Sequence, residues 1–394
     1  MKFFEPSVDP AEGLGVLMLF RLIEESVGSF FRPDRPIHIT RAPGRMDVLG
    51  GRAPGPSSLV LHMPIAEGVC AAIQARDDTL VRLWSPCRDG SRTQLLSMDL
   101  GELGLPASPI DDEEARALFL PDLRDRWAGF LLGALLVLAR RGLRPSHGAE
   151  LLLQSDLPEG RGVAASTAMT LAALRAFARL YGLELSADEQ AALVFEVERA
   201  LVAAPSRPAD VRALLCAEAG ELVALRGPDG AFAGNLVVPM DLEFVGIDSG
   251  IAPTGARTGD GDGADDERTE RFRVLLGAEP SSALRGELGD LLFAAHAAYG
   301  ASGRSEPATD LLVEQAKQRR AAGGAVLGAK ATGRGGGGTV VLLGERGKVW
   351  YEALRIKKAL LAATGHSGHI FRWSSPGALS FGAIDLTPRR SPGP

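Results

Sequence analysis

Residues 155–168 read Ser-Asp-Leu-Pro-Glu-Gly-Arg-Gly-Val-Ala-Ala-Ser-Thr-Ala and connect two segments of different character. The stretch before them, Ala149 to Gln154, is typical of a strand, and Ser166 to Tyr181 carries Ala and Leu at helical spacing. The sequence therefore predicts a strand, a glycine-rich turn and a helix in direct succession.

Such a turn is suited to binding an anion. Backbone N–H groups are exposed at the start of a helix, where the positive end of the helix dipole also lies, and both favour phosphate. In the first helical turn, Ser166 could offer its hydroxyl to a metal ion that bridges phosphates. The glycines alone fit a tight turn without a ligand equally well. The residues expected to bind the cofactor here are Gly160, Gly162, Val163, Ala164, Ala165, Ser166 and Thr167.

Other glycine-loop families fit less well. Gly160 to Ala165 match the G-x-G-x-x-A dinucleotide fingerprint, with Glu184 near the expected acidic position. The match lies in mid-chain, however, and Pro158 leads into it, which argues against a dinucleotide fold. No G-x-x-x-x-G-K-[ST] motif occurs, so the chain is not a P-loop enzyme.

A second glycine-rich run, residues 330–338, reads Lys-Ala-Thr-Gly-Arg-Gly-Gly-Gly-Gly and leads directly into an apolar segment, Thr339 to Leu343. Four consecutive glycines are costly in chain entropy, and such a run persists where backbone must approach a ligand or another backbone closely. Because a buried strand follows at once, a structured loop is favoured over a flexible linker. Gly335, Gly336 and Gly337 are expected to contribute to the cofactor site.

The length and pattern of the chain indicate two domains. Single cores stop growing beyond about 250–300 residues, and this chain has 394. Strands and helices are mixed in both halves, which predicts two α+β domains, residues 1–220 and 221–394. The Gly- and Asp-rich stretch from Gly255 to Arg271 is expected to be a loop.

The composition excludes several classes of function. A formal net charge of −6 gives no electrostatic footprint for nucleic acid or an anionic membrane. The three cysteines are scattered and lack C-x-x-C spacing, which argues against a disulfide framework or a zinc site and favours a reducing cytoplasm. No signal peptide or membrane-spanning run is recognised. We expect a soluble cytoplasmic protein whose partner is a small molecule.

Taken together, these segments resemble a known family. Residues 41–51, Arg-Ala-Pro-Gly-Arg-Met-Asp-Val-Leu-Gly-Gly, resemble the first motif of the GHMP kinase superfamily. They resemble it in the form found in the L-arabinokinase branch of the galactokinase family. Pro158 to Ala168 resemble the second, phosphate-binding motif, and Lys330 to Thr339 the third. Residues 363–366 and 374–378 also resemble the C-terminal segment of arabinokinases. The resemblance implies a ribosomal-S5-like N-terminal domain, a ferredoxin-like C-terminal domain and an active site between them.

The resemblance also implies an activity, the transfer of the γ-phosphoryl group of ATP to a sugar hydroxyl, typically the anomeric one, with Mg²⁺ as the metal. By the same resemblance, Ser166 and Glu198 match the magnesium ligands. Asp210 matches the carboxylate that accepts the hydroxyl proton, and Arg45 matches the arginine beside it. Phosphoryl transfer needs charge neutralisation and an oriented nucleophile, which such a set supplies.

The chain departs from the family mainly on the acceptor side. The family's sugar-binding Asp-Tyr pair is replaced by Pro54-Gly55, and its Cys-Gly-x-Met-Asp-Gln segment reads Ser-Arg-Pro-Ala-Asp-Val at residues 206–211. Two hypotheses therefore stay open. The chain is either a kinase with a different acceptor, with Arg52 or Arg207 contacting an anionic group, or a degenerate kinase that binds nucleotide and acts as a sensor or partner.

Overall fold

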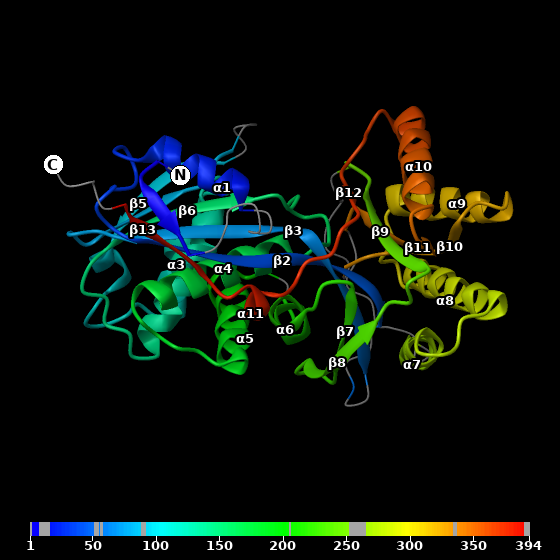
Figure 1. Ribbon diagram of the computed structural model, residues 1–394. Helices are drawn as coiled ribbons and strands as arrows, with labels where there is room; N and C mark the ends of the chain where they lie inside the picture. The colour runs from blue at the N-terminus through cyan, green and yellow to red at the C-terminus, as the bar shows by residue number, and fades with distance from the viewer. Residues whose placement is uncertain are drawn as a thin grey trace.

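The computed structural model describes residues 2–7, 16–50, 55, 58–87, 92–204, 206–251, 265–333 and 337–389, and it contains two sheets flanked by helices (Figure 1). The larger sheet contains the strands β1 (Phe4–Pro6), β2 (Ile37–Gly50), β3 (Leu59–Ala75), β4 (Leu80–Trp84), β5 (Leu95–Asp99), β6 (Ala149–Ser155), β7 (Glu221–Arg226), β8 (Ala231–Val237) and β13 (Ile384–Pro388). The smaller sheet contains β9 (Leu242–Asp248), β10 (Val326–Ala331), β11 (Thr339–Glu345) and β12 (Ile370–Phe371).

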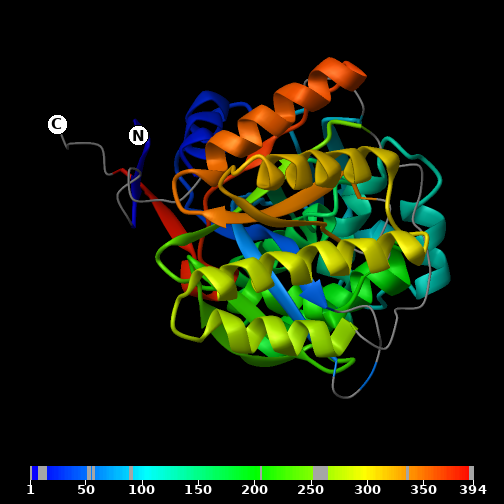
Figure 2. The ribbon, with the colours of Figure 1, turned by 90° about the vertical axis from the view of Figure 1, so that its right-hand side faces the viewer.

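The helices divide between the two sheets in the same way. With the larger sheet lie α1 (Leu17–Ser26), α2 (Asp112–Phe119), α3 (Arg126–Arg140), α4 (Ala165–Leu180), α5 (Ala187–Glu196), α6 (Pro208–Cys216), α11 (Ala378–Phe381) and a 3₁₀ turn, η1 (Leu100–Leu103). A π-helical turn, η2 (Val197–Leu201), continues α5. With the smaller sheet lie α8 (Ser282–Ala301), α9 (Pro307–Ala321) and α10 (Val349–Thr364), while α7 (Asp265–Leu276) packs on α8 and on β2 and β3 (Figure 2). No helix in the described ranges is long and apolar enough to cross a bilayer.

Two long antiparallel strands, β2 and β3, form the middle of the larger sheet. One half of β3 pairs with β6, from Val69 opposite Ser155 to Ala75 opposite Ala149. The other half pairs with β7, from Leu59 opposite Arg226 to His62 opposite Val223. Because these strands are longer than their neighbours, they extend from the larger sheet toward the smaller one (Figure 1).

Alternation along the strands divides the core into layers, since neighbouring strand residues face opposite sides of a sheet. In β6, Leu151 and Leu153 face the main core below α3 and α4, whereas Leu152 joins a second cluster under α1. In β11, Val341 and Leu343 belong to the same main core, while alternate residues pack under α9 and α10. The main core is therefore continuous between the two sheets.

The expected domain boundary at residue 220 stays a prediction, but the strand pairing divides the chain at other places. Both β7 and β8 follow residue 220, yet they extend the larger sheet through β3. The last strand, β13, also returns to this sheet and lies between β1 and β2. Because β1 in turn pairs with β13, the first and last strands of the described chain lie side by side (Figure 1).

The elements around the glycine-rich turn are those predicted from the sequence. The predicted loop at residues 255–271 is different. The expected strand and helix correspond to β6 and α4. The expectation of a loop over residues 255–271 is wrong from Asp265 onward, where α7 begins. Its acidic first turn suits a helix N-terminus, and Thr269, Phe272 and Leu275 are buried on one side of it. Residues 252–264 lie outside the described residues.

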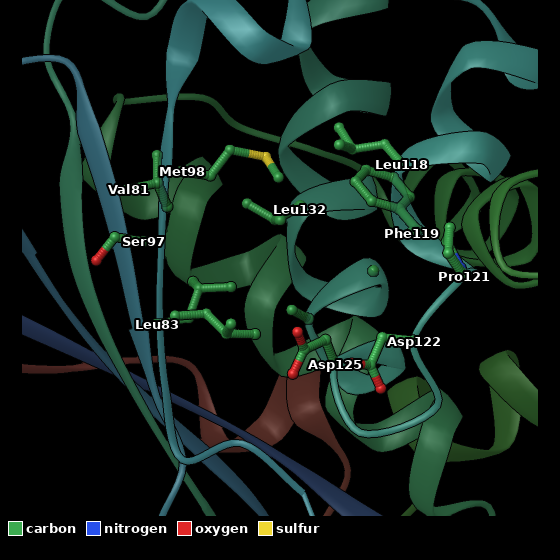
Figure 3. Close-up of a pocket in the computed structure, with 13 residues that line it drawn as sticks. Val81, Leu83, Ser97, Met98, Leu118, Phe119, Pro121, Asp122, Asp125 and Leu132 are labelled. Atoms are coloured by element: carbon green, nitrogen blue, oxygen red, sulfur yellow. The ribbon is translucent and has the colours of Figure 1, made fainter.

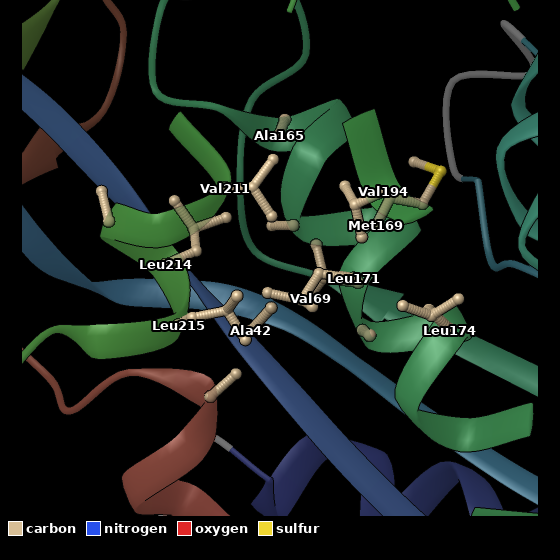
Figure 4. Close-up of a cluster of buried hydrophobic side chains, with 14 of the residues drawn as sticks. Ala42, Val69, Ala165, Met169, Leu171, Leu174, Val194, Val211, Leu214 and Leu215 are labelled. Atoms are coloured by element: carbon tan, nitrogen blue, oxygen red, sulfur yellow. The ribbon is translucent and has the colours of Figure 1, made fainter. Parts of the chain in front are cut away.

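Helix α4 is the element that fixes the turn in place, because its apolar face is packed between the larger sheet and α5 and α6. Figure 4 shows Leu171 and Met169 of α4 among Val69 and Ala42 of the sheet and Val194 and Val211 of the neighbouring helices. Twelve of its sixteen residues are buried. The start of the helix is thus held by a rigid core.

We predict that Leu171→Ala lowers the free energy of unfolding by about 2–5 kcal/mol, because the side chain is fully buried and its removal leaves a cavity. The measurement is urea denaturation followed by circular dichroism. Leu361→Ala, on the exposed side of α10, is the matched control and should change stability by no more than about 0.5 kcal/mol. Equal losses in the two variants would contradict this role for α4.

Candidate active site

The two glycine-rich segments meet backbone to backbone. At Gly162, with φ of +78°, an added Cβ would lie 3.1 Å from the carbonyl oxygen of Thr332. At Gly333 and Gly337 an added Cβ would lie 3.0 and 3.2 Å from the Cα of Gly162. The expected convergence of the two loops is therefore present in the described residues. Gly335 and Gly336 lie outside them.

The turn before α4 has the geometry of an anion-binding nest. Gly160, Gly162 and Ala164 all adopt positive φ, and Ala164 does so as the N-cap residue without a capping side chain. Left-handed residues alternating with ordinary ones turn successive N–H groups toward one point. The first N–H groups of α4, including those of Ser166 and Thr167, have no partner within the helix. A left-handed alanine costs about 1–2 kcal/mol, a strain that is found mostly at functional sites.

Arg45 connects this turn to the candidate base. Its backbone N–H donates to the carbonyl of Val163, and its Nη1 donates to the carbonyl of Gly162, each at 3.1 Å. Its Nη2 donates to Asp210 Oδ1 at 2.6 Å, and both side chains are buried. The structure thus brings Arg45, Asp210 and the turn together, as the resemblance implied.

A second guanidinium also binds Asp210. Arg207, at the N-cap of α6, donates from Nη2 to Asp210 Oδ1 at 3.1 Å and from Nε to Oδ2 at 3.4 Å. Burial by itself raises the pKa of Asp210, but the charges of Arg207 and Arg45 outweigh it and hold this pKa far below its ordinary range. Asp210 is therefore ionised at any physiological pH.

Three further polar residues lie in the buried cluster formed around Arg45, Arg207 and Asp210, and the sequence analysis did not identify them as site residues. They are Asp47, His62 and Lys330. Asp47 is buried, with its Oδ2 3.7 Å from Arg207 Nη2 and its Oδ1 3.9 Å from Lys330 Nζ. His62 is fully buried on β3, opposite Asp47 of β2, and burial followed by the charge of Arg45 lowers its pKa to about 3. A histidine within the apolar strand run 58–65 was the signal that could have identified it.

Glu198 forms the centre of a cluster of hydroxyl groups. It lies in the π-helical turn η2, and π-turns are frequent at functional sites. The hydroxyls of Ser166 and Thr167 each donate to Oε1 at 3.0 Å, and that of Ser206 donates to Oε2 at 2.5 Å. Complete burial raises the pKa of Glu198 to about 7, although these hydrogen bonds oppose the shift.

A cavity of about 180 Å³ lies between β4 and β5 on one side and α2 and α3 on the other (Figure 3). Its walls are mainly apolar, with Leu83 and Met98 facing Phe119 and Leu132. The neighbouring Trp127 of α3 is linked to the turn, since Arg92 lies over its ring at 5.3 Å and binds Glu159 at 2.6 Å.

The cavity also has a polar side. Ser97, Asp122 and Asp125 line it, and Asp125 Oδ1 is buried without a hydrogen-bond partner in the described part of the chain. An unpaired buried acceptor of this kind suits a ligand that carries an N–H donor.

Comparison with known proteins identifies the class of fold. Residues 129–218 match the family described as GHMP kinases N terminal domain. The chain resembles the solved galactokinase of Lactococcus lactis in complex with galactose, with a TM-score of 0.69 and 17% identity over 92% of this chain and 98% of the other. It resembles the mevalonate kinase of Methanococcus jannaschii with a TM-score of 0.58 and 17% identity, over 88% and 99% of the two chains. The protein therefore has the two-domain GHMP kinase fold.

Comparison of the amino-acid sequences identifies relatives with named sugar-kinase activities. The chain is 26% identical to the L-arabinokinase of Arabidopsis thaliana over 93% of its own length. It spans about half of that protein, 48%. It is also 26% identical to the galactokinase of Streptomyces coelicolor, over 88% of this chain and 95% of the relative. The resemblance noted in the sequence is thus confirmed: L-arabinokinase and galactokinases are homologues of this chain.

We predict that Gly162→Ala destabilises the protein by about 1 kcal/mol more than Gly160→Ala does. Both substitutions place an alanine at positive φ, but only at Gly162 does the new Cβ meet the backbone of the second loop. Urea denaturation of the two variants measures the difference. Equal stabilities would show that the two loops are not in close contact.

We predict that the stability of the folded protein depends on pH, because the pKa of Glu198 is raised. Its pKa in the folded protein, about 7, lies above the ordinary carboxyl value of 4.5, so the fold binds a proton that the unfolded chain loses between these pH values. Its contribution to stability is therefore full below pH 4.5 and is lost as the pH rises through 7.

Urea denaturation of the wild type and of Glu198→Gln at pH 5 and pH 8, without divalent cations, tests this assignment. The amide does not ionise, so the wild type should lose about 2–4 kcal/mol relative to the variant over this range. A stability difference that does not change with pH would exclude a raised pKa for Glu198.

Proposed function

We propose that the protein is an ATP- and Mg²⁺-dependent sugar kinase that transfers the γ-phosphoryl group to the anomeric hydroxyl of a monosaccharide, acting in the cytoplasm. The observation that carries the proposal is the junction of a phosphate-type turn with an ion-paired carboxylate, made by Arg45 between Gly162 and Asp210. The homology to L-arabinokinase and galactokinases supports the same reaction class.

The phosphates and the base of ATP each have a matching feature in the structure. The phosphates would bind the N–H groups of residues 163–167 at the start of α4, backed by the second glycine loop. The adenine base would enter the apolar cavity between β4, β5, α2 and α3, where the unpaired Asp125 Oδ1 can accept a hydrogen bond from its amino group. Arg92 and Glu159 connect these two regions.

The residues at Glu198 fit a magnesium ion. Mg²⁺ prefers oxygen ligands and is usually held by one or two carboxylates together with substrate phosphates, and Glu198 and Ser166 offer a carboxylate and a hydroxyl beside the turn. No group of three His, Cys, Asp or Glu side chains suited to a metal occurs among the described residues, and this mode of binding needs none. When bound, the ion would neutralise charge on the phosphates.

Asp210 would act on the acceptor. In the proposed reaction the acceptor oxygen forms a bond to the γ-phosphorus, the bond from this phosphorus to the bridging oxygen breaks, and ADP leaves. Asp210 orients the hydroxyl and accepts its proton, while Arg45 keeps the carboxylate ionised. A weak base is sufficient in a loose transition state, because the hydroxyl loses its proton late.

One observation favours a second function. Asp210 is bound by two guanidinium groups, from Arg45 and Arg207, and both of its oxygens have a partner. If Arg207 never leaves the carboxylate, the protein would bind nucleotide without turnover and act as a sensor or partner. ATP or ADP would then raise the melting temperature, with no ADP released across a panel of sugars, whereas turnover of any sugar would exclude this function.

We predict that Asp210→Asn lowers kcat by at least about 100-fold and leaves ATP affinity nearly unchanged, because the carboxylate faces the acceptor rather than the phosphates. The asparagine keeps the volume of the buried side chain. Coupled ADP release measures kcat, and the ATP-induced shift in melting temperature measures nucleotide binding. Full activity in this variant would remove Asp210 from the mechanism.

A further inference from the structure

The side chain of Arg161 connects the phosphate-type turn to the smaller sheet. Arg161 lies between Gly160 and Gly162, and its Nη1 donates a hydrogen bond to the carbonyl of Ile251, which follows β9. Its Nε lies 3.8 Å from Oδ1 of Asp248, the last residue of β9. The side chains of Arg161 and Asp248 are only 17% and 5% exposed. A cation of the turn is therefore bound by the smaller sheet, largely out of contact with solvent.

The end of β9 that binds Arg161 is itself fixed. The backbone N–H of Asp248 donates to the carbonyl of His369 at 2.9 Å, and the Oδ1 of Asp248 accepts from the N–H of Gly250 at 3.1 Å. Asp248 also lies opposite Thr339 in the pairing of β9 with β11. Because its backbone is held in this way, the carboxylate cannot follow a displaced arginine unless the smaller sheet moves with it.

The second glycine loop meets the same contact. A Cβ added to Gly338 would lie 3.1 Å from Asp248 Oδ1 and 3.2 Å from Arg161 Nη1. The carbonyl of Gly338 accepts a hydrogen bond from the N–H of Ser249 at 2.8 Å. One residue earlier, a Cβ added to Gly337 would lie 3.4 Å from the carbonyl oxygen of Arg161. The guanidinium thus lies where the turn, the end of β9 and the described end of the second loop come together.

Arginine adds a directed bond at the place where the glycine backbones meet. Van der Waals contacts between two backbones limit how closely the loops approach, but they set the orientation of the loops only weakly. A hydrogen bond from a charged donor has a preferred length and angle and is about twice as strong as a neutral one. The bond from Arg161 therefore fixes how the turn, which belongs to the larger sheet, faces Gly337 and Gly338.

We propose that Arg161 is a positioning residue for phosphoryl transfer. It holds the end of β9, and with it Gly337 and Gly338, in the position at which the second loop and the N–H groups at the start of α4 bind the phosphates of one nucleotide. The inference rests on the proposed kinase function. Arg161 takes no part in the bond changes, so its effect on the rate comes from where the γ-phosphoryl group lies relative to Asp210.

The test measures the Kd of ATP with Mg²⁺ by isothermal titration calorimetry, and kcat by coupled ADP release with the best acceptor from a panel of monosaccharides. Arg161→Gln removes the charge, so we expect ATP to bind about 10-fold more weakly, which corresponds to the loss of one charge-assisted hydrogen bond. We expect kcat to fall by about 10- to 100-fold, because a small displacement of the phosphates slows the chemical step. Arg161→Lys, which can still donate to a carbonyl, should recover most of both values.

A double-mutant cycle assigns the effect to the contact with β9. Asp248→Asn keeps the shape of the side chain, removes its charge and should weaken ATP binding about threefold. Because Arg161→Gln and Asp248→Asn break the same contact, the loss of affinity in the double variant should be smaller than the product of the two single losses.

Arg179→Gln is the matched control. Arg179 lies in the last turn of α4, and its ion pair with Asp385 of β13 is 2.5 Å long. The substitution removes an arginine–carboxylate pair from the helix that follows the turn, without changing a contact of the turn itself. The Kd of ATP and kcat should therefore stay within about twofold of the wild-type values.

Two results would overturn the positioning role and leave the kinase standing. One is an unchanged Kd and kcat in Arg161→Gln with only a lower melting temperature, because a purely structural residue behaves in this way. The other is a double variant whose loss equals the product of the single losses. If Arg161→Gln does not fold, Asp248→Asn decides: weaker ATP binding supports the role, and wild-type affinity overturns it.

The same measurements separate this inference from the kinase proposal. Wild-type protein that binds ATP but phosphorylates no sugar overturns the kinase and the effect on kcat, whereas the Kd values still decide whether Arg161 positions the phosphate-binding loops. Wild-type protein that binds no ATP overturns both.

Discussion

Arg45 is buried, and its guanidinium donates at once to the carbonyl of Gly162 and to the carboxylate of Asp210. A buried cation is stable only when such partners are present, so the phosphate-type turn and the start of α6 must lie on either side of this one side chain. The backbone of Arg45 is itself fixed, because β2 pairs with β3 and its N–H donates to Val163. The position of the candidate base relative to the turn follows from this arrangement.

The second constraint is the contact between the two glycine loops. An added Cβ at Gly162 or Gly333 would lie only 3.0–3.1 Å from the backbone of the other loop, so glycine allows the smaller sheet to approach the turn this closely. The side chain of Arg161 in the turn also contacts the carbonyl of Ile251 and the carboxylate of Asp248 at the end of β9. The carbonyl of Gly333 also accepts a hydrogen bond from the hydroxyl of Tyr299 at 2.8 Å, which ties this loop to α8. Glycine is needed here for contact between two backbones, independently of any ligand.

Asp210 and Glu198 show how neighbouring carboxylates acquire opposite properties. Both are buried, which by itself raises the pKa of each. Asp210 has two guanidinium partners and stays ionised, whereas Glu198 has only neutral hydroxyl partners and reaches a pKa of about 7. A cation near Glu198 would restore its charge, which is the behaviour expected of a metal ligand.

The sequence by itself determined the local elements. It predicted the strand, turn and helix around residues 155–168, because periodicity and glycine placement act over short distances, and the joint order of three motifs identified the superfamily. Only the tertiary structure decided the charge cluster. Asp47, His62 and Lys330 come from separate strands, and His62 is opposite Asp47 only through the register of β2 and β3. Likewise, β13 and α7 form where burial against distant strands stabilises them, a contribution that no local pattern contains.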